Sequence, residues 1–250
     1  MAEYFTLKVD GRDLSDFKAY VFNTNWEDGA ERDIETIIVP GRSKPLNIDK
    51  GSWKPFSLYF DIFIASDFLS NFRSLRSFLN TKSDTLYKLE YSGDTETFLL
   101  GRFLGDVSVN KSDRQGGYFR LEFECDARRY FFSGEEELEY TGSKTYTLYN
   151  NTDYEWFPLI KMTGDSSSFY NVGKTQLQVT GSEGREIAFD TDTENIYFTD
   201  DNSNANACVT LRASGSGLTL PTISIPPGKI FIWAGGTGTT LKVKLRGYTI

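Results

Sequence analysis

The sequence contains no histidine. This absence excludes Ser-His-Asp and Cys-His catalysis and almost every transition-metal site, since imidazole is the commonest ligand of such metals. No apolar run approaches the roughly 18–20 residues of a membrane span, so we expect no direct membrane insertion. The first residues, MAEYFTLKVDG, lack a basic segment followed by an apolar one. We therefore expect no secretory signal and a protein made in a cytoplasm.

Sulfur is scarce, with two cysteines and two methionines, whereas aromatic residues are abundant. Cys125 closes an apolar strand, so a buried free thiol is favoured over a disulfide with the distant Cys208. The 20 phenylalanines, 14 tyrosines and four tryptophans favour sheets over helical bundles. We expect a mainly β protein.

One stretch, Ala65 to Thr81, has a helical pattern, and we predict a helix over about residues 66–80. Either Ser66 or Asp67 can cap its start through a side-chain oxygen. Apolar residues recur at three- and four-residue spacing, which gives the helix one apolar face. These residues are Phe68, Leu69, Phe72, Leu75, Phe78 and Leu79. Such a face requires a sheet or a partner to pack on. Because the surrounding sequence predicts strands, we expect one helix packed on a β-structure.

The strand pattern divides the chain into two predicted domains. In residues 1–134, alternating stretches such as Ser57 to Ile64 predict a β-sandwich or tube-like domain carrying the helix. Residues 135–139 hold four glutamates and predict an exposed acidic connection. Residues 140–250 show only short strands about ten residues apart, which is typical of a β-sandwich.

A long polar excursion interrupts the first domain after Val39. Pro40-Gly41 ends a strand, and a turn-rich segment continues to Gly51. We predict an arm over about residues 40–56 that packs on a neighbouring molecule. Arg42 is either an exposed turn residue or the partner of a carboxylate on that neighbour.

Two groups of motifs resemble a known family. The first is Ile37-Ile-Val-Pro-Gly-Arg42, followed by Asp49-Lys-Gly51 and an aromatic strand. The second occupies the later half of the chain in a fixed order. It comprises Phe157-Pro-Leu-Ile-Lys-Met-Thr-Gly164, Ile187-Ala-Phe-Asp190, Leu220-Pro221, Pro227-Gly228-Lys229 and a last strand around Lys242 to Arg246.

Together these motifs resemble the distal tail proteins (Dit) of siphophages, the long non-contractile-tailed bacteriophages. Ser43-Lys44-Pro45 departs from the family pattern, in which a second glycine turn is usual, and Lys229 stands where asparagine is common. The resemblance implies a galectin-like second domain and a hexameric ring. The ring would join the tail tube to the host-adsorption apparatus and let DNA pass.

The resemblance also implies partners and a location. The partners would be further copies of the chain, the tail tube protein, a tail-associated tip protein and a receptor-binding protein, all at the tail tip of a virion assembled in the host cytoplasm. The interface residues that we assign to the ring lie in the arm. They are Pro40, Gly41, Arg42, Lys44, Asp49 and Trp53.

The charge is compatible with a ring that DNA only passes through. The formal net charge is −8, and residues 1–134 contribute 18 basic and 21 acidic side chains (18 − 21 = −3). An acidic surface repels phosphates, so we expect no sequence-specific binding of nucleic acid.

Other site types are weaker alternatives. Thirty-five carboxylates leave room for a hydrolase pair, but no spacing singles one out. An oxygen-rich cluster could hold calcium, although a solvated loop is favoured because the EF-hand spacing is absent. The cluster comprises Asp190, Asp192, Glu194, Asp200 and Asp201. We therefore predict no catalytic residue, no metal and no cofactor.

Carbohydrate binding is the alternative function. Sugar-binding galectins use a histidine, which this chain lacks, so their site cannot be carried over. Trp156 and Trp233 are candidates for stacking on a sugar, although packing in the core is favoured for both. The main hypothesis is a non-enzymatic structural hub. The alternative is a carbohydrate-binding module that recognises a cell-surface glycan.

Overall fold

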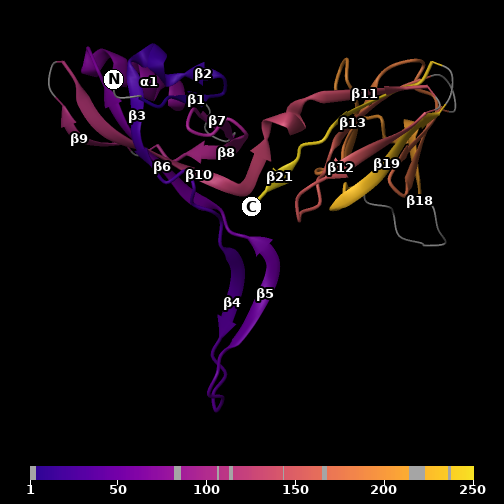
Figure 1. Ribbon diagram of the computed structural model, residues 1–250, viewed down its shortest axis with the longest axis horizontal. Helices are drawn as coiled ribbons and strands as arrows, with labels where there is room; N and C mark the ends of the chain where they lie inside the picture. Colours follow the sequence, from indigo (N-terminus) through magenta and orange to yellow (C-terminus); the bar gives the residue numbers. More distant parts are fainter. Residues whose placement is uncertain are drawn as a thin grey trace. The chain divides into compact units, whose positions relative to one another are not determined.

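The computed structural model describes residues 4–81, 86–105, 107–112, 115–142, 144–164, 168–213, 223–235 and 238–250. The chain forms two compact units, Met1–Arg129 together with Ile250, and Tyr130–Thr249. Both units are built from antiparallel strands, and one α-helix lies in the first (Figure 1). The prediction of a mainly β protein with one helix is confirmed.

A nine-stranded sheet has the order β2-β1-β7-β8-β10-β6-β3, with β9 and β21 also paired to β10. It forms the body of the first unit, although β21 itself belongs to the second. An isolated bridge between Phe5 and Val21 joins the β1 end of this sheet to β3. Its strands are β1 (Leu7–Val9), β2 (Arg12–Asp13), β3 (Ala19–Thr24), β6 (Phe56–Ile64), β7 (Tyr87–Tyr91), β8 (Thr97–Phe103), β9 (Ser108–Ser112), β10 (Gly117–Phe131) and β21 (Tyr248–Thr249). A short 3-10 helix, Leu14–Phe17, precedes β3.

Alternation along β6 determines which side of the sheet is buried. Leu58, Phe60, Ile62 and Ile64 are fully buried, as the predicted period of two requires. Antiparallel pairing with β10 places its own apolar residues beside them, for example Phe119 opposite Ile62. These side chains form the core of the first unit.

The helix α1 (Phe68–Leu79) packs on this core, within the predicted range. Its apolar face is narrower than predicted, since Leu69 is 58% exposed. Asp67 occupies the N-cap position, but its side chain makes no capping hydrogen bond. Its left-handed backbone (φ 48°) differs from the extended conformation that aims an N-cap side chain at the first turn.

A two-stranded ribbon, β4 (Arg32–Ile37) and β5 (Leu46–Trp53), leaves the nine-stranded sheet between β3 and β6 (Figure 1). We call it the β4–β5 ribbon. The segment predicted to be turn-rich differs in the structure, because residues 46–53 are strand and the ribbon already begins at Arg32. That this arm packs on a neighbouring molecule stays a prediction. The strand β5 was not predicted because most of its residues are polar and do not show an alternating apolar pattern. Ion pairs across the ribbon join Arg32 to Asp49 and Lys50 to Asp33.

The second unit contains two five-stranded antiparallel sheets, each with alternating buried and exposed positions. The first sheet has the order β11-β20-β13-β16-β17, and the second β12-β19-β14-β15-β18. The strands are β11 (Glu137–Thr141), β12 (Thr145–Asn150), β13 (Leu159–Thr163), β14 (Ser168–Val172), β15 (Thr175–Val179), β16 (Ile187–Asp190), β17 (Asn195–Phe198), β18 (Val209–Ala213), β19 (Gly228–Gly235) and β20 (Thr240–Lys244). Short 3-10 helices cover Phe132–Glu135 and Asn206–Cys208.

The acidic run is not simply a connection. Glu137 and Glu139 belong to β11, where they lie opposite Lys244 and Lys242 of β20. The opposite charges on β20 offset the repulsion among the glutamates, so the run can form a strand. The chain ends by pairing β21 with β10, and the Phe131 N–H donates to the Gly247 carbonyl over 2.8 Å.

Candidate functional surfaces

The β4–β5 ribbon carries all six residues that the sequence assigned to an interface. Pro40 and Gly41 form its turn, where the positive φ of Gly41 (+82°) suits glycine. The Arg42 N–H donates to the Val39 carbonyl over 3.1 Å. Lys44 is exposed near this turn.

The other two residues lie on β5. Asp49 accepts a hydrogen bond from the Gly51 N–H over 2.8 Å and pairs with Arg32 at 3.3 Å. Trp53 is half-buried at the base of the ribbon, with the Arg32 guanidinium 4.6 Å from its ring centroid. Both residues therefore hold the ribbon together, and Arg42 and Lys44 project near its end.

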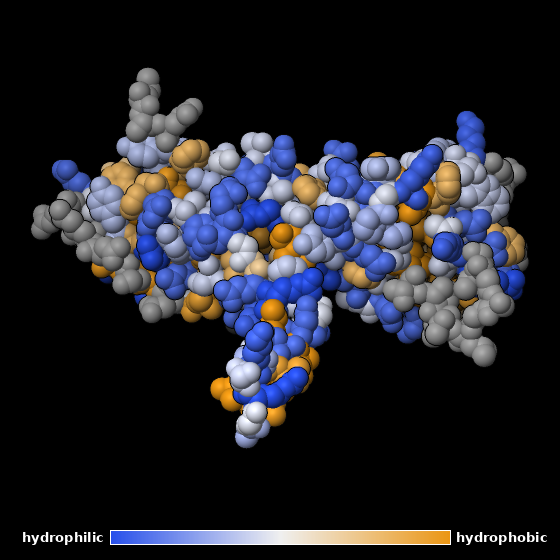
Figure 2. All heavy atoms as spheres, turned by 60° about the horizontal axis from the view of Figure 1, so that its bottom comes forward, coloured by the Kyte–Doolittle hydropathy of each residue, from blue (hydrophilic) through white to orange (hydrophobic). Residues whose placement is uncertain are grey.

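Sequence reasoning missed the apolar side chains of the ribbon. Five aliphatic residues are 38–83% exposed, and Figure 2 shows apolar residues gathered on the projecting ribbon. They are Ile34, Ile37, Ile38, Leu46 and Ile48. Pairing places Ile37 opposite Leu46, and Ile48 follows two residues after Leu46, so these three share one side. The isoleucines in and around this otherwise polar segment were the sequence signal that could have indicated an exposed apolar surface.

A second apolar surface lies on the outer side of the nine-stranded sheet. We define the aromatic patch as Tyr20, Phe22, Phe63 and Tyr118. Phe63 and Tyr118 are opposite each other on β6 and β10, with ring centroids 4.9 Å apart. Phe22 contacts Tyr118 edge-on at 5.6 Å and is 52% exposed. Exposed aromatic clusters of this kind mark contact surfaces.

An ion pair borders the aromatic patch on the same side of the sheet. Arg120 donates to Asp61 through Nε (2.8 Å) and Nη2 (3.0 Å), and Asn23 donates to the same carboxylate over 2.8 Å. The hydrogen bonds from Arg120 lower the pKa of Asp61, although burial acts in the opposite direction. A carboxylate held charged in this way is a structural group rather than a general acid.

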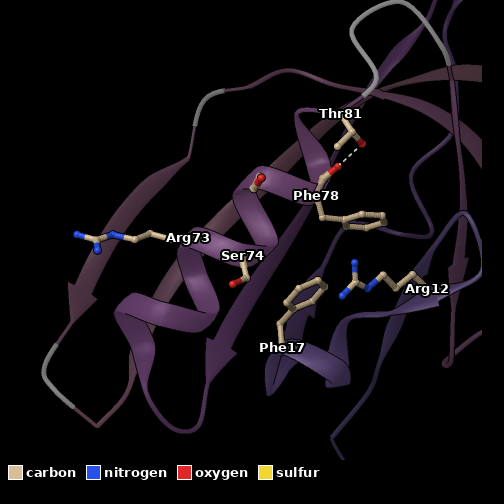
Figure 3. Close-up of a pocket in the computed structure, with 7 residues that line it drawn as sticks. Arg12, Phe17, Arg73, Ser74, Phe78 and Thr81 are labelled. Carbon is tan, nitrogen blue, oxygen red and sulfur yellow. Dashed lines mark hydrogen bonds between the residues drawn. The ribbon is translucent and has the colours of Figure 1, made fainter.

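A depression of about 530 Å³ lies beside α1 (Figure 3). The guanidinium of Arg12 lies 4.4 Å and 5.0 Å from the ring centroids of Phe17 and Phe78. Arg73, Ser74, Ser77 and Thr81 complete the lining. Among the described residues, this lining offers no carboxylate pair and no thiol that would support hydrolysis.

The two tryptophans of the second unit have different environments. Trp156 is only 5% exposed, and its indole N–H donates to Thr152 and to the Tyr248 carbonyl. It is a core residue and offers no face to a sugar. Trp233 lies on β19 and is half-buried.

In the acidic cluster that was considered as a calcium site, aspartates form ion pairs with arginines. Arg246 makes two hydrogen bonds to Asp190, at 2.8 and 3.1 Å. Arg185 pairs with both Asp200 and Asp201. No group of three or more metal-ligating side chains occurs in the described part of the chain. Three of the five carboxylates, Asp190, Asp200 and Asp201, are therefore used in ion pairs, which argues against the calcium alternative.

The cysteines are free, as predicted. Cys125 is fully buried, and this burial raises the pKa of its thiol to about 12. A thiol with such a pKa is inert as a nucleophile near neutral pH. Among the described helices, none is both long and apolar enough to cross a membrane.

Comparison with solved structures gives the fold of this chain a counterpart. The Dit protein of phage SPP1 matches 99% of this chain and 100% of its own, with a TM-score of 0.68 and 16% sequence identity. The fold is that of a distal tail protein. The SPP1 protein is described as a paradigm of the hub adsorption apparatus in phages that infect Gram-positive bacteria.

Two further matches come from the phage p2 baseplate in its activated conformation. The chain from the calcium form covers 97% of this chain with a TM-score of 0.54, and that from the strontium form covers 96% with 0.53. They match over 98% and 97% of their own lengths, and each is 10% identical to this sequence. No protein-family model and no curated protein matches the sequence.

Proposed function

We propose that this chain is a distal tail protein, a non-enzymatic structural hub at the tail tip of a phage. The observation that carries the proposal is the agreement in fold with SPP1 Dit over 99% of the chain, because it includes both units. The matches to the p2 baseplate chains support it. Fold alone does not determine function. The exposed surfaces of the first unit supply the additional argument.

The first unit has features that suit assembly into a closed ring. The β4–β5 ribbon exposes aliphatic side chains, and a two-stranded ribbon is only marginally stable in water by itself. The aromatic patch is a different exposed apolar surface on the same unit. When two different surfaces of one chain bind each other, the interface runs head to tail, and a suitable rotation closes it into a ring.

In the proposed hexamer, the β4–β5 ribbon of each copy docks on the aromatic patch of the next. The ring joins the tail tube to the adsorption apparatus, and DNA passes through it. The formal charge of −8 per chain repels phosphates from its surfaces. The tail-associated tip protein and a receptor-binding protein are the proposed further partners, and the second unit is their platform.

Several observations favour a structural role over catalysis. The chain has no histidine, and its buried thiol has a raised pKa. Three carboxylates of the acidic cluster, Asp190, Asp200 and Asp201, pair with arginines. A tail-associated hydrolase would need an acid/base pair in a cleft. The depression beside α1 provides none.

Light scattering of the purified protein over a concentration series tests the ring. We expect a species of six chains, 6 × 28.4 kDa or about 170 kDa. Since the apolar contacts are the driving force, this mass should persist at moderate salt. A strict monomer at every concentration, both alone and with the neighbouring tail protein added, would reject the hexamer.

A further inference from the structure

The second unit has an outward sheet surface that takes no part in the proposed ring contacts of the first unit. In the sheet β12-β19-β14-β15-β18, Trp233 lies opposite Asn171, Asn171 opposite Gln176, and Gln176 opposite Arg212. Residues opposite one another on neighbouring strands share a side of the sheet. Their strand neighbours, such as Tyr170 and Leu177, are fully buried, so this row points away from the core.

Side-chain polar groups of this row make no hydrogen bonds to other described residues. The side-chain amides of Asn171 and Gln176 and the indole N–H of Trp233 have no hydrogen-bond partner there, although all three side chains are half-buried. The outer side of the other sheet differs. Several of its charged groups form ion pairs, for example Lys161 with Glu137 and Lys242 with Glu186. An unfilled row of donors and acceptors suits a polar ligand.

The charge of this surface is opposite to that of the whole chain. Arg212 and Lys229 are exposed and form no ion pair within the part of the chain that the structure describes. None of the outward-facing residues on the five strands is acidic, although the chain as a whole has a net charge of −8. A local positive surface without neutralising carboxylates attracts an anion.

One aromatic ring, Trp233, ends the row, and a second, Phe231, lies beside it on the same strand. A Cβ atom at Gly235 would lie 2.0 Å from the indole of Trp233, so the indole covers this glycine and lies along the sheet. Phe231, two residues before, is 52% exposed, and the Lys229 ammonium lies 5.3 Å from its ring centroid. A hollow of about 450 Å³ opens beside Lys229 and Phe231 at the β14–β15 turn.

We propose that this Trp233 face, comprising Trp233, Phe231, Lys229, Asn171, Gln176 and Arg212, binds a negatively charged saccharide. A pyranose ring presents C–H groups that pack on an aromatic ring and hydroxyl groups that both donate and accept. Side-chain amides match the hydroxyls because they also donate and accept. The two cations match a carboxylate or phosphate substituent. The face lacks the exposed aliphatic residues that distinguish the β4–β5 ribbon, which favours a sugar over a protein partner.

Binding of the full-length protein to a printed panel of neutral and acidic glycans tests the proposal. We expect binding to acidic glycans, with affinity that falls as salt rises. Trp233→Ala should weaken binding about tenfold by removing the stacking surface. Lys229→Gln should weaken binding to acidic glycans and flatten its salt dependence.

Matched variants and a second polyanion make the outcome decisive. Lys244→Gln removes the same charge from the outer side of the other sheet and should leave binding unchanged. Gln176→Ala removes one amide with little risk to folding and should also weaken binding. The proposal is overturned by binding to no glycan of the panel, by equal binding to polyphosphate, which has charge but no sugar, or by equal losses in Lys229→Gln and Lys244→Gln. Because this assay does not depend on the mass of the ring, its result is separate from the test of the hub role.

Discussion

At the scale of single residues, polar side chains that are partly buried in the first unit are held by several partners. Asp61 accepts from Arg120 and Asn23. Asp94 accepts from the indole N–H of Trp26 over 3.0 Å and from Thr97. Burial by itself would raise the pKa of Asp94, but the hydrogen bonds from Thr97 and Trp26 lower it. Each carboxylate thus links segments that are distant in sequence.

The pairing of Asp61 leads to a prediction about pH. Asp61→Asn should lower the free energy of unfolding at pH 7 by about 1–3 kcal/mol, because the Arg120 guanidinium loses its charged acceptor. The pKa of Asp61 is lower in the folded chain than in the unfolded one, so its contribution is present above the unfolded pKa, about 3.9. It is lost as pH falls through the folded pKa. Urea unfolding at several pH values measures the difference between variant and parent.

Asp16→Asn is the control for this experiment. Asp16 and Arg12 form an exposed pair at 3.9 Å, so its loss should change stability by less than about 0.5 kcal/mol. If the difference between Asp61→Asn and the parent were the same at about pH 2 as at pH 7, the ionic explanation would be wrong.

At the scale of elements, the β4–β5 ribbon is the part of the first unit with the least internal support. Its exposed ion pairs contribute only about 0–1 kcal/mol each. Its aliphatic residues are exposed, and no third strand pairs with it among the strands that the structure describes. Such a ribbon gains stability mainly from whatever covers it, which in the proposed ring is the next copy.

A pair of variants at neighbouring positions tests which side of the ribbon docks on the next copy. Ile37→Glu places a charge beside Leu46 and Ile48 and should abolish the six-chain species, with the thermal unfolding midpoint of the chain little changed. Thr36→Glu adds the same charge one residue earlier, on the opposite side, and should retain it. Light scattering and thermal unfolding of both variants provide the measurements. Equal behaviour of the two in light scattering would contradict a docking surface on the Ile37 side.

At the scale of the whole molecule, the chain consists of two units, each with its own buried side chains. The large core cluster of the first unit contains only residues from Leu7 to Cys125. Separate cores allow separate unfolding. The proposed hub role would make use of this division, since one unit could build the proposed ring while the other binds the proposed partners.

Calorimetry should therefore resolve two unfolding transitions. Asp61→Asn should lower the midpoint of only one, because Asp61 lies in the first unit. Measurement at a concentration below that of ring formation avoids a contribution from association. A single transition that Asp61→Asn shifts as a whole would show that the two units unfold together.

The sequence determined the elements with the strongest periodicity. The 3.6-residue pattern located the helix, and the alternation of Ser57 to Ile64 identified the buried side of β6. The strands β5 and β11 were harder to predict because charged residues occupy many of their positions. Their partners across the ribbon and the sheet neutralise these charges. The residues that neutralise these charges are distant in sequence, so the local sequence around each strand does not show them.

The sequence by itself thus determined the fold class, the free buried thiol and the absence of histidine chemistry. Only the tertiary structure decided which sides of the strands are covered. Periodicity shows which residues share a side, but cover depends on the strands and helices that pack there. For this reason Trp156 is buried, whereas Trp233, the aromatic patch and the aliphatic residues of the β4–β5 ribbon reach the surface.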